Sequence, residues 1–186
     1  MKSLTVNIFQ KTSLTVLLSF LCFIFQFSEC KGQELGYLAG ITKQGINPER
    51  FEPLYGFTIG AKVNRILSIE TAFYYSQRSI GSTIQADYFS FLAMPKIGYF
   101  GKKAGVYYAP GISLNPTLYH SNPENHTYLS TLQALGGQFN ILPELVIDLK
   151  VGLDIGLTGA YFENGHYQNY SGPVIFLGLK YSKTTK

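Results

Sequence analysis

The chain has 186 residues, which is the length of one domain once an amino-terminal presequence is set apart. Hydrophobic residues make up 46% of the chain and charged residues 14%, a composition that excludes a disordered tail and an ordinary cytosolic protein with a charged surface. The formal net charge of +4 is spread along the chain, which excludes a nucleic-acid-binding surface. Fourteen Tyr, fourteen Phe and nineteen Gly indicate a β-rich protein.

Residues 1–32 have the pattern of a secretory signal peptide. Two lysines and no acid precede an apolar run at 13–27, and this run is shorter than the roughly 20 residues that a membrane-spanning helix needs. Small residues then stand at positions −3 and −1 of a cleavage site before Gln33. We expect an exported mature chain of residues 33–186, from which both cysteines have been removed. A retained amino-terminal anchor is the less favoured alternative.

Eight stretches of the mature chain alternate apolar and polar residues with period two, which predicts β-strands. The alternation is clearest from Leu145 to Leu157, where every second residue is aliphatic and most residues between them are polar or glycine. No stretch keeps the apolar spacing of an amphipathic helix for long. The predicted strands are 34–43, 54–64, 66–77, 86–100, 105–115, 128–140, 144–158 and 172–182.

The connections between these strands alternate between short and long. Short turns follow the second, fourth and sixth strands, whereas long segments follow the first, third, fifth and seventh. An even number of antiparallel strands with short turns at one end and long loops at the other is typical of bacterial outer-membrane barrels. We therefore predict an all-β fold, an eight-stranded antiparallel up-and-down transmembrane β-barrel. The loops expected to face outward are 44–53, 78–85, 116–127 and 159–171.

The apolar face of the predicted strands carries aromatic residues near both ends and aliphatic residues between them. Two membrane interfaces select such a distribution, because Tyr can keep its ring among acyl chains and its hydroxyl in water. The aromatic residues expected near the long loops are Tyr55, Phe57, Phe73, Tyr75, Phe89, Phe91, Tyr128 and Tyr161. Those expected near the short turns are Tyr37, Tyr99, Tyr108, Phe139 and Tyr181.

The opposite, polar face holds charges of both signs and many glycines, and we assign it to the lumen. The interior of an eight-stranded barrel is just wide enough to be filled by side chains, so buried charges there must be partnered. Glu70 and Lys96 lie on neighbouring predicted strands at similar heights and are expected to pair. We expect ion pairs that fill the lumen without leaving a channel. The predicted lumen charge network consists of Lys62, Glu70, Lys96, Asp148, Lys150, Asp154 and Lys180.

Three stretches of the mature chain resemble the PorT-like outer-membrane β-barrel family of Gram-negative bacteria. They are FLAMPKIGYFG at 91–101, VYYAPG at 106–111 and LGLKY at 177–181. The resemblance implies a small barrel of the OmpA/OmpX type, surrounded by outer-membrane lipid and lipopolysaccharide. It also implies insertion by the barrel-assembly machinery, for which Tyr181 is the expected terminal aromatic residue. The family supplies no catalytic residue, and we predict no cofactor and no metal site.

The chain lacks the phosphate-binding, nucleophile-elbow and zinc-binding motifs of common enzymes, so a structural or loop-mediated binding role is expected. One alternative is a lipid-modifying barrel enzyme of the lipid A deacylase or acyltransferase type. It would use Ser, His and Glu residues in and beside the two largest loops, among them His126, Ser130 and Ser171. The other is a soluble lipocalin-like carrier. The loop residues selected as binding candidates are Tyr119, His120, Asn122, Tyr161, Phe162, His166 and Tyr167.

Overall fold

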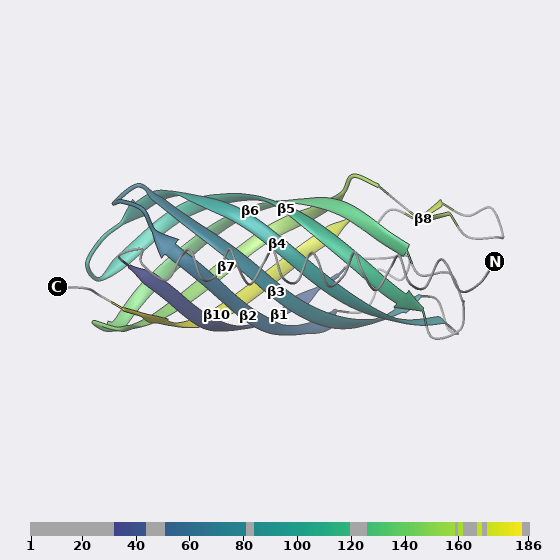
Figure 1. Ribbon diagram of the computed structural model, residues 1–186, viewed down its shortest axis with the longest axis horizontal. Coiled ribbons are helices and arrows are strands. Elements are labelled where there is room, and N and C mark those ends of the chain that lie inside the picture. Colours follow the sequence, from purple (N-terminus) through teal and green to yellow (C-terminus); the bar gives the residue numbers. More distant parts are fainter. Residues whose placement is uncertain are drawn as a thin grey trace, which may run out of the picture.

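The computed structural model describes residues 32–43, 51–80, 84–119, 126–158, 160–161, 167–168 and 171–183. These residues form a closed barrel of eight antiparallel strands (Figure 1). Among the described residues, no helix is long and apolar enough to cross a membrane. The barrel strands are β1 (Gln33–Thr42), β2 (Glu52–Lys62), β3 (Leu67–Ile80), β4 (Ile84–Phe100), β5 (Ala104–Tyr119), β6 (His126–Leu142), β7 (Leu145–Gly156) and β10 (Gly172–Ser182).

Each barrel strand pairs with its neighbours in the chain, and β1 closes the barrel by pairing with β10. Tyr37 on β1, for example, lies opposite Leu179 on β10 and opposite Phe57 on β2. Closure gives every strand two partners, so no strand edge of the barrel is left unpaired. The predicted eight-stranded antiparallel fold is therefore confirmed.

The central strands are longer than the sequence pattern predicted. The segment 78–85 was expected to be a loop, but β3 continues to Ile80 and β4 begins at Ile84. In the same way, β5 ends at Tyr119 and β6 begins at His126, so both strands extend into the predicted loop 116–127. A backbone ladder needs only paired N–H and C=O groups, so it continues where the apolar alternation has stopped. The fourth predicted loop contains a separate pair of two-residue strands, β8 (Ala160–Tyr161) and β9 (Tyr167–Gln168).

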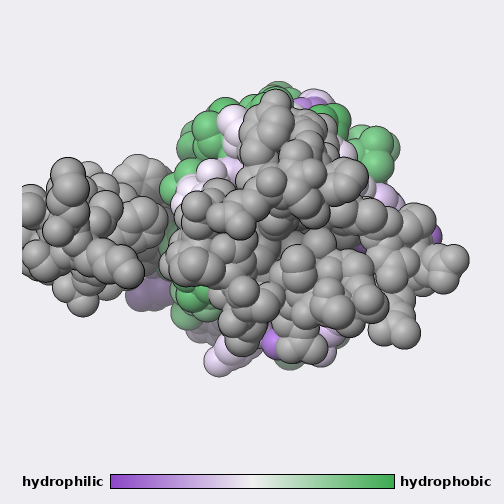
Figure 2. All heavy atoms as spheres, turned by 90° about the vertical axis from the view of Figure 1, so that its right-hand side faces the viewer, coloured by the Kyte–Doolittle hydropathy of each residue, from purple (hydrophilic) through white to green (hydrophobic). Residues whose placement is uncertain are grey.

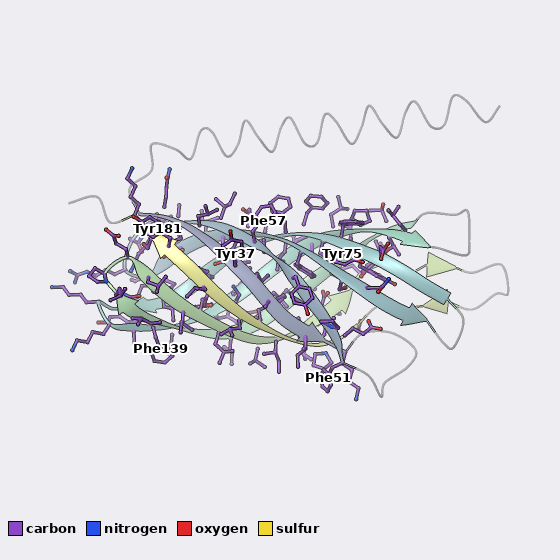
Figure 3. All side chains as sticks on the ribbon, turned by 90° about the horizontal axis from the view of Figure 1, so that it is seen from below. Tyr37, Phe51, Phe57, Tyr75, Phe139 and Tyr181 are labelled. Atoms are coloured by element: carbon purple, nitrogen blue, oxygen red, sulfur yellow. The ribbon has the colours of Figure 1, made fainter. Side chains whose placement is uncertain are left out.

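The outer wall of the barrel is apolar. Exposed side chains include Tyr37, which is 80% exposed, and Leu135, which is 69% exposed. Tyr37, Phe57 and Tyr181, which are labelled in Figure 3, are all exposed side chains of this wall. Hydrophobic residues are also visible on the outside of the barrel in Figure 2. Outward rings of neighbouring strands contact one another. Phe57 of β2 stacks on Phe73 of β3 with ring centroids 4.9 Å apart, and Phe73 meets Phe91 of β4 edge to face at 5.0 Å. A soluble barrel would place such residues inside.

One residue assigned to the outer aromatic belt lies inside the barrel instead. Tyr128 is only 2% exposed, and its ring meets that of Tyr88 edge to face at 6.0 Å. The reason is strand parity, because Tyr128 shares the inward face of β6 with Ser130 and Leu132. For Tyr161, which was assigned to the same belt, the side chain lies outside the described part of the chain.

Candidate functional site

Five charged side chains from four strands meet in the lumen, and each is at most 1% exposed. The Lys96 Nζ atom lies 2.5 Å from Glu70 Oε2 and 2.7 Å from Asp148 Oδ2. The Lys150 Nζ atom lies 2.5 Å from Glu70 Oε1 and 3.2 Å from Asp148 Oδ2. Lys180 donates hydrogen bonds to both carboxylates. Each carboxylate therefore contacts all three ammonium groups, which satisfies the requirement that buried charges be paired.

The strand register explains how these side chains converge. Successive residues of a strand point to opposite faces, and all five lie on the inward face of their strands. Lys180 is two residues from Gly178, which pairs with Asp148 across β10 and β7. On its other side Lys180 lies opposite Gly36 of β1, where an added Cβ atom would be 2.5 Å from the Lys180 Cγ atom. Glycine at position 36 therefore leaves the room that the lysine side chain needs.

Two further residues complete this group, and sequence reasoning had missed both. The Tyr107 hydroxyl donates to Asp148 Oδ1, and the Lys96 Nζ atom lies 4.6 Å from the centroid of the Tyr107 ring. The Glu34 Oε2 atom is 3.9 Å from the Lys180 Nζ atom. Strand parity was the signal that could have found them, because each lies on the inward face of its strand. We call Glu34, Glu70, Lys96, Asp148, Lys150 and Lys180 the lumen charge cluster.

The lumen charge cluster is formally neutral, since three carboxylates face three ammonium groups. Apart from Glu34, its members are held by short contacts and are at most 1% exposed, and electrostatic interactions between buried charges are strong. A neutral, fully paired cluster offers no excess charge to attract a passing ion.

Two of the seven predicted network residues lie apart from the lumen charge cluster. Lys62, near the short turns, is only half-buried, and its Nζ atom lies 5.4 Å from the centroid of the Phe100 ring. Asp154 is 3% exposed but lies six residues beyond Asp148 on β7, about 20 Å along a strand that rises about 3.3 Å per residue. The structure thus brings five of the seven together and places the other two near opposite ends of the lumen.

An apolar layer fills the lumen on the long-loop side of the charge cluster. Leu38, Tyr74, Leu92 and Phe176 are all buried, and each lies four residues further toward the long loops than a cluster residue on the same strand. The Tyr74 and Phe176 rings pack edge to face with centroids 5.6 Å apart. On the other side of the cluster, Phe100 stacks on Tyr107 with ring centroids 5.8 Å apart. An apolar layer therefore packs on the charges from the long-loop side, and the Phe100 ring lies on their short-turn side.

A second polar group lies beyond the apolar layer, toward the long loops. The Ser90 hydroxyl donates to Asn115 Oδ1 at 2.5 Å, and the Ser113 and Ser130 hydroxyls are 2.5 Å apart. The Asn115 amide also donates to Ser130 Oγ at 3.1 Å. Ser130 is one of the serines considered for a lipid-modifying enzyme, and its hydroxyl is engaged inside the barrel rather than presented at the outer rim.

The predicted binding loops lie mostly beyond what the structure describes. His120, Asn122, Phe162 and His166 are outside the described residues. The backbones of Tyr119, Tyr161 and Tyr167 belong to β5, β8 and β9, but their side chains are outside the described part as well. Their binding role stays a prediction.

No protein-family model matches the sequence, and no curated protein matches it. Solved structures do match. Neisserial surface protein A aligns with a TM-score of 0.66 at 11% identity, over 80% of this chain and 96% of that chain. Ail, the attachment invasion locus protein of Yersinia pestis, aligns with a TM-score of 0.56 at 12% identity, over 83% of this chain and 99% of that one. The outer membrane protein OprG of Pseudomonas aeruginosa aligns with a TM-score of 0.56 at 9% identity, over 84% and 97%. The chain therefore has the fold of small outer-membrane barrels.

Proposed function

We propose that this protein spans the outer membrane of a Gram-negative bacterium as a closed barrel with a structural or loop-mediated binding role. The apolar outer wall and the polar lumen support a membrane location, because this is the reverse of the arrangement in a soluble barrel. The proposal includes export by the signal peptide at residues 1–32 and a mature domain at 33–186. It also includes PorT-like kinship, contact with lipopolysaccharide and insertion by the barrel-assembly machinery.

The observation that carries this proposal is the filling of the lumen. The lumen charge cluster is neutral and buried, an apolar layer packs on its long-loop side, and the Phe100 ring lies on its short-turn side. A permeating ion would have to break several short ion pairs and then cross an apolar layer without a partner, which is costly. Transport through the barrel is therefore disfavoured, and the exposed loops are left as the place for function.

A rigid barrel that holds loops above a membrane is a suitable scaffold for binding. The proteins of similar fold include Ail, an attachment invasion locus protein, and one of the Ail structures is a complex with the heparin analogue sucrose octasulfate. By analogy in fold alone, we assign loop-mediated attachment to this chain. Tyr119, His120 and His166 are the first residues to substitute in a binding assay.

Neither alternative has the same support. A soluble lipocalin-like carrier would have to keep side chains such as Leu135 and Val151 in water, on an outer wall where both are more than half exposed. A lipid-modifying enzyme would need a serine at the outer rim, but Ser130 binds Ser113 and Asn115 inside the lumen. The Ser171 hydroxyl accepts a hydrogen bond from the Gly156 backbone N–H at 3.0 Å.

Planar-bilayer recording of the refolded protein tests the closed lumen. We expect no stable unitary conductance, because side chains fill the interior. Insertion is checked in parallel by the change in electrophoretic mobility on heating and by protection from protease in vesicles. Steady, ion-selective steps from inserted protein would show an open channel and would replace the binding role with transport. A folded protein that stays soluble without detergent or lipid would establish the carrier instead.

A further inference from the structure

The end of the barrel that carries the short turns presents a group of exposed basic residues. These residues come from three separate places in the chain, namely the β2–β3 turn, the β4–β5 turn and the residue that follows β10. We call this group the short-turn collar. Its exposed cations are Arg65, Lys102, Lys103 and Lys183.

Hydrogen bonds hold the turns of the short-turn collar in place. The Asn64 side-chain oxygen accepts hydrogen bonds from the backbone N–H groups of Ile66 and Leu67, at 2.7 and 2.8 Å. The Phe100 N–H donates to the Arg65 carbonyl at 3.0 Å, which joins the β2–β3 turn to β4. In the next turn, the Asn140 side-chain amide donates to the Lys102 carbonyl at 2.7 Å. The backbones that carry these cations are therefore held in place before any partner binds, which lowers the entropic cost of binding.

Charge at this end of the barrel is unbalanced. Among the described residues there, Glu144 is the exposed carboxylate, and it accepts a hydrogen bond from Tyr181. Glu34 lies at the same end, but it is buried and faces Lys180 in the lumen charge cluster. The collar therefore has a positive surface that its own carboxylates do not neutralise, and it is suited to an anionic partner.

Apolar side chains lie among these cations, which is unusual for turns. Ile66 in the β2–β3 turn is 63% exposed, and three further aliphatic residues at the same end are also more than half exposed. Turns that project into water are normally polar. Basic and apolar side chains together match the boundary of a bilayer, where apolar groups enter the acyl region and cations meet phosphates. The three further residues are Val63, Ile141 and Leu142.

We propose that the short-turn collar binds the phosphate groups of anionic phospholipids in the leaflet that surrounds the short turns. The inference rests on the proposed function in one respect, namely that the barrel spans a membrane. Each basic residue near an anionic leaflet contributes about 1 kcal/mol, which corresponds to about fivefold in affinity. Four such residues are enough to select an anionic lipid over a zwitterionic one.

Native mass spectrometry of the refolded barrel tests this proposal. Wild-type protein is released from vesicles that contain equal amounts of phosphatidylglycerol and phosphatidylcholine, and the lipids that stay bound are counted. We expect wild type to retain phosphatidylglycerol preferentially. Arg65→Gln, Lys102→Gln, Lys103→Gln and Lys183→Gln combined in one chain should lower this preference by roughly tenfold or more, and high salt should weaken it in wild type because exposed charges are screened.

A charge-matched pair of double variants separates the collar from a general effect of positive charge. Lys102→Gln with Lys103→Gln removes two collar cations, whereas Lys43→Gln with Arg50→Gln removes two cations that the sequence places at and beyond the other end of β1. The first pair should lower the preference and the second should leave it unchanged. Equal retention of both lipids by wild type, or an unchanged preference in the folded quadruple variant, would show that the proposal is wrong. A barrel that inserts into neither kind of vesicle would overturn the membrane location as well, so the two failures are distinguishable.

Discussion

Replacing Glu70 by glutamine removes one carboxylate from the lumen charge cluster and leaves almost the same shape. Glu70 contacts Lys96 and Lys150 at 2.5 Å and also contacts Lys180, and it is 1% exposed. The glutamine side chain can still accept hydrogen bonds, but the cluster then carries one uncompensated positive charge. We therefore expect an electrostatic loss of stability that has little contribution from a cavity.

The magnitude follows from the geometry. Removing one partner of a buried ion pair costs about 3 to 5 kcal/mol, because the remaining charge is left unpaired in a dry environment. Asp148 and Glu34 remain to face three lysines, so we expect the Glu70→Gln loss to lie in that range. A loss of about 3 kcal/mol changes the folding equilibrium more than a hundredfold, which is easily measured.

Urea titration of the refolded protein in detergent, followed by far-ultraviolet circular dichroism, measures this loss. The double variant Glu70→Gln with Lys150→Met makes the lumen charge cluster neutral again and should recover at least half of the lost stability. Lys102→Gln removes an exposed charge and should unfold close to wild type. If Glu70→Gln unfolded within about 1 kcal/mol of wild type, the cluster would have to be hydrated, and the argument for a closed lumen would fail.

Three further predictions concern packing, the lipid-facing wall and processing. Gly136→Ala places a Cβ atom against the Tyr107 ring and should lower the free energy of unfolding, measured by urea titration, by about 1 to 3 kcal/mol. At the adjacent Gly137 a Cβ atom would make only ordinary contacts, the nearest at 3.7 Å, so Gly137→Ala should not be destabilising. Val151→Lys puts an ammonium on the outer face in the middle of β7 and should cost about 2 to 4 kcal/mol, while Val151→Leu should be tolerated. Mass spectrometry of the exported protein should find Gln33 at its amino terminus, and retained Met1 would contradict the cleavage site.

The fold could be predicted because its two signals are local in the sequence. Period-two alternation identifies each strand and its outward face, and the alternation of short and long connections gives the up-and-down order. The strand bounds could not be predicted so well. Beyond Ser76 the apolar alternation stops, yet β3 continues to Ile80, because the hairpin with β4 is held by backbone pairs such as Ser79 with Gln85.

The lumen contacts were predicted only in part, because they depend on how the barrel closes. Strand parity placed Glu70, Lys96 and Lys150 on the inward face, and neighbouring strands suggested the Glu70–Lys96 pair. The contact of Glu70 with Lys180 joins residues 110 positions apart across the lumen, and no local sequence pattern shows which inward side chains meet there. Glu34 shares the inward parity of Gly36 and Leu38, but it is the first residue of the first predicted strand and was not assigned to a face.

The enclosure of the charge cluster also determines where this protein can meet a partner. A ligand arriving from the long-loop end meets buried Tyr88 and Tyr128 and then the apolar layer around Tyr74 and Phe176 before it reaches any cluster charge. At the short-turn end, the Phe100 ring stacks on Tyr107, whose hydroxyl donates to Asp148, and Glu34 is buried against Lys180. On the proposed function, the cluster stabilises the barrel and recognition falls to the two ends. These ends differ in chemistry, because the short turns carry basic and apolar side chains suited to a lipid leaflet, whereas the predicted long loops are rich in Tyr, His and Asn suited to polar contacts.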